Sequence, residues 1–189
     1  MMDVACIGDL HGNIDDWLRL RKGHRMTIQL GDLGCGFAEL PPPVDGHYFI
    51  RGNHDSPDIA RSRPDYLGDF GMMGAMFYAS GAASIYRDQR TPGLDWWADE
   101  ELSESDMDAA AQLYAERRPD IVVTHCAPRE VELRIGAAWR GSRTSHWLQR
   151  LLEIHRPSVW VFGHYHEAHD FVLNGTRFIC VAKNTNPVM

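Results

Sequence analysis

Side chains that can bind metals follow short apolar runs at five places in this sequence. The runs VACI, MTIQL, HYFI, DIVVT and VWVF lead into GDLHGN, GDLG, RGNHD, HCAP and GHYH. These five turns supply seven candidate ligands: Asp9, His11, Asp32, Asn53, His125, His164 and His166. Carboxylate, imidazole and amide groups without a thiolate suit manganese, iron or zinc. The chemistry that this pattern indicates is metal binding.

The apolar runs are expected to be buried strands that bring the turns together. Buried parallel strands have continuous apolar runs, and ligands of open α/β sheets collect beyond the carboxyl ends of the strands. His164 and His166 are two positions apart, so both can turn toward one point just past a strand. Taken singly, Asp9 or Asn53 is equally typical of an ordinary turn. The metal-site hypothesis therefore depends on the five turns together.

Helices are expected between these strands. Ile14, Trp17, Leu18 and Arg21 follow the i, i+3, i+4, i+7 spacing and predict a helix over 13–22. Ser103 can cap a second helix. A third helix is expected from Thr144 or Ser145 until Pro157 stops it.

Later segments favour hairpins. The dipeptide Asn174-Gly175 suits a type I′ turn between two strands. A second hairpin is expected over 76–86. The region 56–102 is the least regular part and is expected to line or cover the site. Strands alternating with helices, followed by hairpins, predict an α/β fold with two packed sheets and helices outside.

The order D-x-H, G-D, G-N-H-D, a single H and G-H-x-H resembles the calcineurin-like metallophosphoesterase family. The blocks run from Asp9 to His166 and so cover most of the chain. The resemblance implies an α/β fold in which a two-sheet β sandwich is flanked by helices, a four-layer αββα architecture. It also implies that the protein is an enzyme, a metal-dependent phosphoesterase. Such enzymes are hydrolases that act on ester bonds.

The resemblance assigns the seven ligands to two divalent metal ions. The first ion would be held by Asp9, His11 and His166. The second would be held by Asn53, His125 and His164. Asp32 would bridge them, because a carboxylate has two oxygens and the ions of such sites lie about 3.5–4 Å apart. Manganese is the expected metal, and iron or zinc also suits these ligands.

The same resemblance implies hydrolysis by a hydroxide that bridges the metals, so no protein nucleophile is required. His54 is expected to be catalytic, either stabilising the transition state or protonating the leaving oxygen. Asp55 is expected to orient the His54 imidazole and support it electrostatically. Arg51 is the candidate for binding substrate phosphate through its planar guanidinium.

The favoured substrate is a small phosphoester, a diester or a monoester, with a nucleotide as one candidate. The alternative is a serine/threonine protein phosphatase, but such enzymes typically have G-D-x-V-D-R-G where this chain has GDLGCGF, with Cys35 and Gly36 at the aspartate and arginine positions. An alternative of another class is a non-catalytic scaffold with the same fold. Substrate selection is expected from two segments, 90–102 and 128–143. Their candidate side chains are Trp96, Trp97, Arg129, Arg134, Arg140 and Arg143.

Length and composition predict a single metallophosphoesterase domain over residues 1–189. The chain is 44% hydrophobic and 24% charged, as is common for globular domains. A net charge of −7 disfavours strong affinity for nucleic acid or an anionic membrane. No apolar run reaches the roughly 18 residues of a membrane span, and no signal-peptide pattern is present. A cytoplasmic location is therefore expected, and the four widely spaced cysteines predict reduced thiols.

Overall fold

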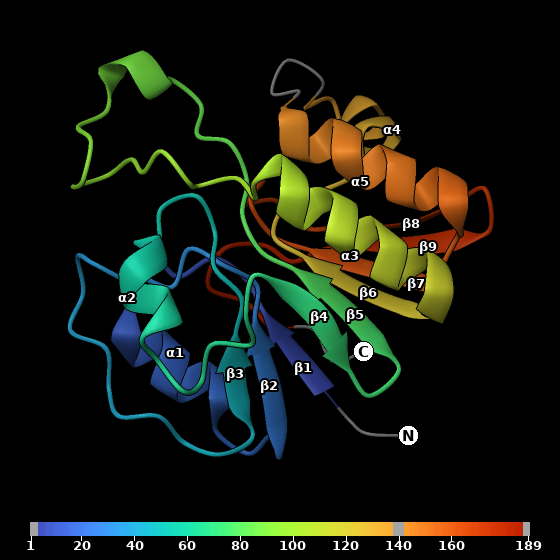
Figure 1. The fold of residues 1–189 in the computed structure, drawn as a ribbon. Helices are drawn as coiled ribbons and strands as arrows, with labels where there is room; N and C mark the ends of the chain where they lie inside the picture. The colour runs from blue at the N-terminus through green and yellow to red at the C-terminus, as the bar shows by residue number, and fades with distance from the viewer. Residues whose placement is uncertain (1–3, 138–141, 187–189) are drawn as a thin grey trace.

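The structure, a computed structural model, describes residues 4–137 and 142–186 and contains a smaller and a larger β-sheet. The smaller sheet has three parallel strands in the order β1-β2-β3. These strands are β1 (Val4–Ile7), β2 (Met26–Gln29) and β3 (His47–Phe49). Two helices, α1 (Ile14–Arg21) and α2 (Pro57–Arg61), lie on its outer side (Figure 1).

The larger sheet has six strands in the order β4-β5-β6-β7-β9-β8. They are β4 (Phe70–Met73), β5 (Met76–Ala79), β6 (Ile121–Thr124), β7 (Val159–Phe162), β8 (His169–Leu173) and β9 (Thr176–Cys180). The four central strands are parallel, and each edge strand joins its neighbour in an antiparallel hairpin. The outer face carries α3 (Glu104–Arg117), α4 (Arg129–Arg134) and α5 (Arg143–Ile154) (Figure 1).

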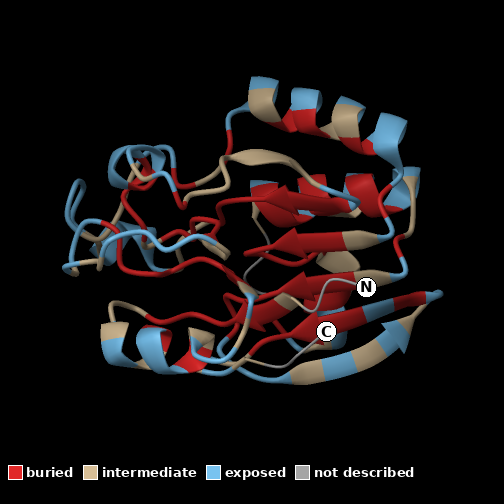
Figure 2. Ribbon diagram, turned by 90° about the horizontal axis from the view of Figure 1, so that it is seen from below, coloured by how far each residue is buried: buried red, intermediate tan, exposed pale blue. Residues whose placement is uncertain are grey.

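Apolar clusters fill the spaces between these layers. Between the sheets, Cys6 and Ile28 of the smaller sheet meet Val123 and Val161 of the larger one. Trp17 of α1 belongs to a separate cluster outside the smaller sheet, and residues of α3, α4 and α5 form the cluster outside the larger sheet. Figure 2 shows the buried strands in the middle, with the exposed faces of the helices outside. The predicted α/β fold with αββα layers is confirmed.

The expected strands and helices are present, with differences at some boundaries. The helix α3 is capped by Ser103, whose side chain accepts a hydrogen bond from the Asp106 N–H. The helix α5 starts slightly earlier than expected, because Ser142 and Ser145 form a reciprocal cap. Asn174-Gly175 joins β8 and β9, and both residues have positive φ.

One predicted hairpin is wrong in its position. Sequence favoured strands on both sides of Gly81 over 76–86, but β5 instead pairs with β4, which precedes it. The turn between them is Gly74-Ala75, and Gly74 has a φ of 61°. From Gly81 onward the chain leaves the sheet and projects away from the body (Figure 1). This projecting segment includes a short 3₁₀ turn, η1 (Arg87–Gln89), and returns at Glu100 shortly before α3.

The fold brings the candidate ligands to the carboxyl ends of strands from both sheets. Asp9 and His11 follow β1, and Asp32 follows β2. His125 and the pair 164/166 follow β6 and β7 of the larger sheet. Among the residues that the structure describes, no helix has the length and apolar character needed to span a bilayer.

Candidate metal centre

Four of the predicted ligands form one compact group: Asp9, His11, Asp32 and His166. One ligand atom from each lies within 4.8 Å of all the others. The Nε2 atoms of His11 and His166 are 2.9 Å apart, and His166 Nε2 is 3.0 Å from Asp9 Oδ2. Ligands that surround one ion at about 2.0–2.2 Å are separated by such distances. The group therefore fits a divalent cation, as was predicted for the first ion.

The second group is centred on His125, which is fully buried. Its Nδ1 lies 2.7 Å from the carbonyl oxygen of Leu30 and must donate to it, because a carbonyl can only accept. In the neutral ring, Nε2 then carries a lone pair. This Nε2 faces the Asn53 side-chain oxygen at 3.2 Å and Asp32 Oδ1 at 3.6 Å. Three lone-pair atoms that face one another with no hydrogen between them fit a cation in that position.

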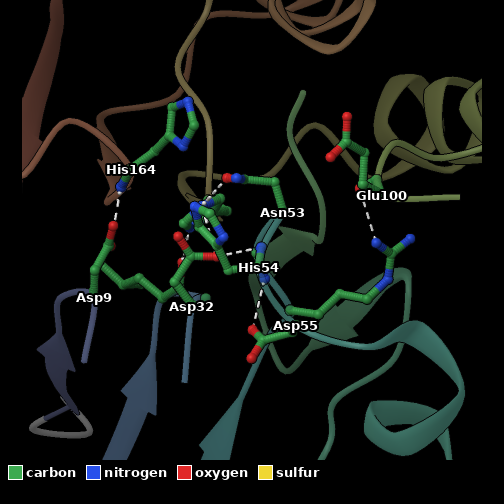
Figure 3. A network of polar contacts seen from close by, with 12 residues as sticks. Asp9, Asp32, Asn53, His54, Asp55, Glu100 and His164 are labelled. Carbon is green, nitrogen blue, oxygen red and sulfur yellow. Dashed lines mark hydrogen bonds and ion pairs between the residues drawn. The ribbon is translucent and has the colours of Figure 1, made fainter. Parts of the chain in front are cut away.

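His164 lies beside the second group. Its ring is edge-on to the His125 ring, with the ring centres 4.9 Å apart, and its side chain is largely buried. Its backbone N–H donates to Asp9 Oδ1 at 3.0 Å, which ties the turn after β7 to the turn after β1. Figure 3 shows His164, Asp9, Asp32 and Asn53 around one region beyond the ends of the strands.

Asp32 stands between the groups with its two carboxylate oxygens facing different partners. Its Oδ2 is 3.8 Å from His11 Nε2 in the first group, whereas its Oδ1 is 3.6 Å from His125 Nε2 in the second. The Oδ1 atom also accepts the backbone N–H of His54 at 2.8 Å. This bond fixes the carboxylate in the orientation that a bridging ligand requires.

The electrostatics of the two buried aspartates differ. Burial raises the pKa of Asp32 well above its usual range, and the charges of Asp9 and Asp55 raise it further. Burial would also raise the pKa of Asp9, but the His166 imidazole and other nearby imidazole and N–H groups outweigh it, so that this pKa lies below its usual range. Burial lowers the pKa of His11 to about 4. The site thus offers a neutral His11 imidazole and places two carboxylates where added positive charge is needed for both to ionise.

The ligand turns have unusual backbone geometry. The φ angle is 46° at His11, 55° at Asp32, 69° at His164 and 63° at His166. A residue with a Cβ pays about 1–2 kcal/mol for this left-handed conformation, and such strain clusters at functional sites. Hydrogen bonds hold it in place: the N–H of His11 donates to the Asp32 carbonyl at 2.7 Å.

Two glycines allow the strand ends to approach the ligands closely. A Cβ on Gly52 would overlap Asp32 Oδ1 and would lie 2.7 Å from His125 Nε2. A Cβ on Gly31 would overlap His125 Nδ1, and Gly31 also has a φ of 101°. Any side chain at these two positions would displace the ligands.

Asp55 has a different position from the one that sequence predicted. Its carboxylate is fully buried and accepts four backbone N–H groups, those of Leu33, Gly34, Cys35 and Gly52, at 2.8–3.2 Å. None of these bonds goes to the His54 ring. The expectation that Asp55 orients this imidazole is therefore not met, because its oxygens are occupied by the backbone. Asp55 instead joins the turn after β2 to the turn after β3.

The partner of the His54 imidazole is Arg90, which sequence reasoning did not single out. A guanidinium nitrogen of Arg90 lies 3.2 Å from His54 Nδ1. Burial, followed by the charge of Arg90, lowers the pKa of His54 to about 3. The His54 ring is also edge-on to His11, with 5.2 Å between the ring centres, so it adjoins the first group. No local motif reveals this pair, because the two residues are 36 positions apart in the chain.

Arg51 does not lie where a substrate could reach it. Its side chain is fully buried, and the guanidinium donates to Asp69 Oδ1 at 3.0 Å and to the Glu100 carbonyl at 2.8 Å. The expected contact with substrate phosphate is therefore incompatible with its position. Burial would raise the pKa of Asp69, but the Arg51 charge and hydrogen bonds from neighbouring side chains outweigh it and hold that pKa below its usual range.

The two segments expected to select substrate have mainly structural contacts. Trp96 and Trp97 are half-buried, and Arg87 stacks on the Trp96 ring with 4.8 Å to its centre. Arg129 pairs with Glu132 at 3.0 Å, and Arg143 donates to the Leu102 carbonyl at 2.8 Å. Arg134 stacks on a phenylalanine ring. The predicted Arg140 lies outside the described residues.

The family assignment rests on a match over most of the chain. A family model described as calcineurin-like phosphoesterase matches residues 2–168. The chain belongs to the calcineurin-like phosphoesterase family. A calcineurin-like phosphoesterase is a metal-dependent hydrolase, and the grouped ligands of Asp9, His11, Asp32 and His166 agree with this activity. A search of curated proteins finds no match.

Solved structures agree with the calcineurin-like fold. The protein TT1561 of Thermus thermophilus is similar with a TM-score of 0.59 and 13% identity, over 97% of this chain and 90% of that one. GAP50, described as the anchor in the inner membrane complex of Plasmodium, is similar with a TM-score of 0.51 and 10% identity, over 97% of this chain and 72% of that one. At these identities the likeness shows the fold alone.

Proposed function

We propose that this calcineurin-like phosphoesterase is a dinuclear hydrolase of small phosphoesters. The observation that carries the proposal is the position of Asp32, whose two oxygens face the two donor groups separately. One group alone would support a single ion. A carboxylate between two groups supports a pair of ions about 3.5–4 Å apart, as in other two-metal hydrolases.

We assign the residues to the two ions as the resemblance implied. Asp9, His11 and His166 would hold the first ion, Asn53, His125 and His164 the second, and Asp32 both. When bound, the two ions supply Lewis-acid stabilisation of phosphate oxygens and an activated water at neutral pH. The ligand types suit manganese, and we propose Mn²⁺ as the metal, with iron and zinc as the other candidates.

His54 would act on the substrate as a hydrogen-bond donor. An arginine can only donate, so the contact with Arg90 requires the Nδ1 atom of His54 to accept. The hydrogen of the neutral ring is then on Nε2. This geometry favours the first of the two expected roles, stabilisation of the transition state, over protonation of the leaving oxygen.

The substrate would be a small diester or monoester, with a nucleotide as one candidate. The alternative of a serine/threonine protein phosphatase loses support, because the chain lacks the usual arginine at position 36 and Arg51 is buried. A non-catalytic scaffold with this fold does not require the hydrogen bond between Arg90 and His54.

Hydrolysis of two chromogenic substrates tests the proposal. Metal-stripped protein would be assayed on bis-p-nitrophenyl phosphate and p-nitrophenyl phosphate after addition of Mn²⁺, Fe²⁺ or Zn²⁺, with Asp32→Asn as the matched variant. The dinuclear site is supported if wild type shows metal-dependent turnover and if Asp32→Asn loses both this turnover and one equivalent of bound metal. Faster diester cleavage would select a phosphodiesterase, and faster monoester cleavage a phosphatase. Absence of turnover with all three metals would refute the proposed function and favour the scaffold.

A further inference from the structure

A chain of hydrogen bonds connects the second ligand group to the projecting segment between β5 and α3. Asn53 Nδ2 is 3.1 Å from Ser84 Oγ, and Ser84 Oγ is 2.6 Å from Glu100 Oε2. The other Glu100 oxygen, Oε1, accepts the backbone N–H of Ser84 at 3.0 Å. Ser84 and Glu100 lie at the two ends of the projecting segment, and Figure 3 shows Glu100 on the side of Asn53 away from Asp9.

The donors and acceptors in this chain can be ordered in only one direction. A carboxylate accepts, so the single hydroxyl hydrogen of Ser84 is used on Glu100. The oxygen of Ser84 must then accept from Asn53, and only the amide NH₂ group can donate. The amide oxygen of Asn53 is left facing His125 Nε2 at 3.2 Å.

This ordering matters because the two ends of an asparagine amide have nearly the same shape and opposite electrostatics. The oxygen is a metal ligand, whereas the NH₂ group presents hydrogens and repels a cation. Rotation by half a turn about the last side-chain bond exchanges them with no change in packing. An acceptor atom such as the Ser84 hydroxyl oxygen can bond only the NH₂ end, and so it removes this ambiguity.

We propose that Ser84 and Glu100 are positioning residues that fix the Asn53 amide with its oxygen toward the second metal ion. The inference rests on the proposed dinuclear function and deepens it. Asn53 is largely buried and Glu100 is 3% exposed, so water does not readily replace either partner. The Glu100 backbone is held separately by Arg51, which donates to its carbonyl at 2.8 Å, so a change of the Glu100 side chain leaves this end of the segment attached.

Metal titration by calorimetry tests the inference without an activity assay. Metal-stripped wild type, Ser84→Ala, Ser84→Thr and Glu100→Gln would be titrated with MnCl₂. We expect wild type to bind two ions, and Ser84→Ala to keep the first affinity while losing about 10–100-fold in the second, the usual effect of removing the partner of a ligand. Ser84→Thr keeps the hydroxyl and should restore the second affinity. Glu100→Gln should also weaken it, because glutamine has one oxygen for the two Ser84 donors and its NH₂ group can donate to the Ser84 hydroxyl and free that hydrogen.

A matched control is Glu101→Gln, which changes a carboxylate that accepts from Thr144 at 2.8 Å. This variant should bind both ions as wild type does. If wild type binds a single ion, the dinuclear function itself fails. If wild type binds two ions and Ser84→Ala binds both equally well, the positioning role is wrong and the dinuclear function stands. If Ser84→Ala weakens binding of both ions and also lowers the melting temperature, the role of Ser84 is purely structural and the inference is overturned.

Discussion

Asp55→Asn should destabilise the protein through the backbone of two ligand turns. In the wild type, Oδ1 accepts from Gly34 and Cys35, and Oδ2 accepts from Leu33 and Gly52. Asparagine keeps one oxygen and therefore two of these bonds. Its NH₂ group would face the other two N–H groups, leaving two buried donors without an acceptor.

The expected loss follows from these two donors. A buried donor without a partner costs about 1–3 kcal/mol, so Asp55→Asn should lower the free energy of unfolding by about 2–6 kcal/mol. For a chain of this length, that corresponds to a fall in melting temperature of about 4–24 °C. Because total stability of a domain is about 5–15 kcal/mol, this loss is a large fraction of it and the variant should denature early.

Urea denaturation of the metal-stripped protein, followed by circular dichroism, measures this loss. Asp58→Asn is the matched control, because Asp58 is an exposed aspartate in the first turn of α2 and should lose less than about 1 kcal/mol. The reasoning would be refuted if Asp55→Asn kept its stability within about 1 kcal/mol while its turnover fell. That result would return Asp55 to the role of supporting the His54 imidazole.

The remaining predictions concern metal binding, the Arg51–Asp69 ion pair and His54. Mn²⁺ at 100 times its dissociation constant should stabilise the metal-stripped protein by about 2.7 kcal/mol per independent site, which raises the melting temperature by about 5–11 °C. EDTA should reverse this rise, and an unchanged melting temperature would contradict the metal site. Arg51→Met should lower the free energy of unfolding by about 1–3 kcal/mol, because the Glu100 carbonyl loses its donor and Asp69 keeps Arg61 but loses Arg51 as a partner. KM should be unchanged in the folded fraction, and a raised KM at full stability would restore a substrate role. The pKa of Asp69 is lowered on folding, so its stabilising contribution is complete above its ordinary value of about 3.9 and is lost as pH falls through the folded value. Wild type should therefore lose more stability than Asp69→Asn between about pH 5 and pH 2.5 in denaturation curves, and parallel losses would exclude the linkage. His54→Ala should lower turnover by one to several orders of magnitude at constant metal content, and Arg90→Gln should lower it by about tenfold. If Arg90 acts through His54, the double variant His54→Ala with Arg90→Gln should be no slower than His54→Ala alone.

The sequence was sufficient for features that are encoded locally. Each of the five ligand turns follows a short, mainly apolar strand, so strand position and ligand identity could be read in the same short stretch. Helix α3 was equally accessible, because its cap at Ser103 and its buried residues lie within one segment. The fold class followed from the order of these elements.

Contacts between distant segments were not accessible in this way. Asp55 is adjacent to His54, which suggested a partnership, but its actual partners in the turn after β2 are about 20 residues away. Arg51 adjoins the GNH motif, yet parallel strands and the return of Glu100 bury it. Ser84 and Glu100 belong to an irregular segment without periodicity, so nothing in their neighbourhood indicates the asparagine they reach.

The left-handed backbone at the ligand turns sets stability and activity against each other. Glycine at His11 would relieve about 1–2 kcal/mol of steric strain, more than the roughly 0.5–1 kcal/mol that its extra freedom in the unfolded chain costs. In the absence of metal, no energy of coordination offsets that strain. A library screened for thermal resistance in chelator should therefore enrich glycine at 11, 164 and 166, and its most heat-resistant members should be unable to bind metal. Screening in saturating Mn²⁺ reverses the selection, because the energy of coordination then exceeds the strain.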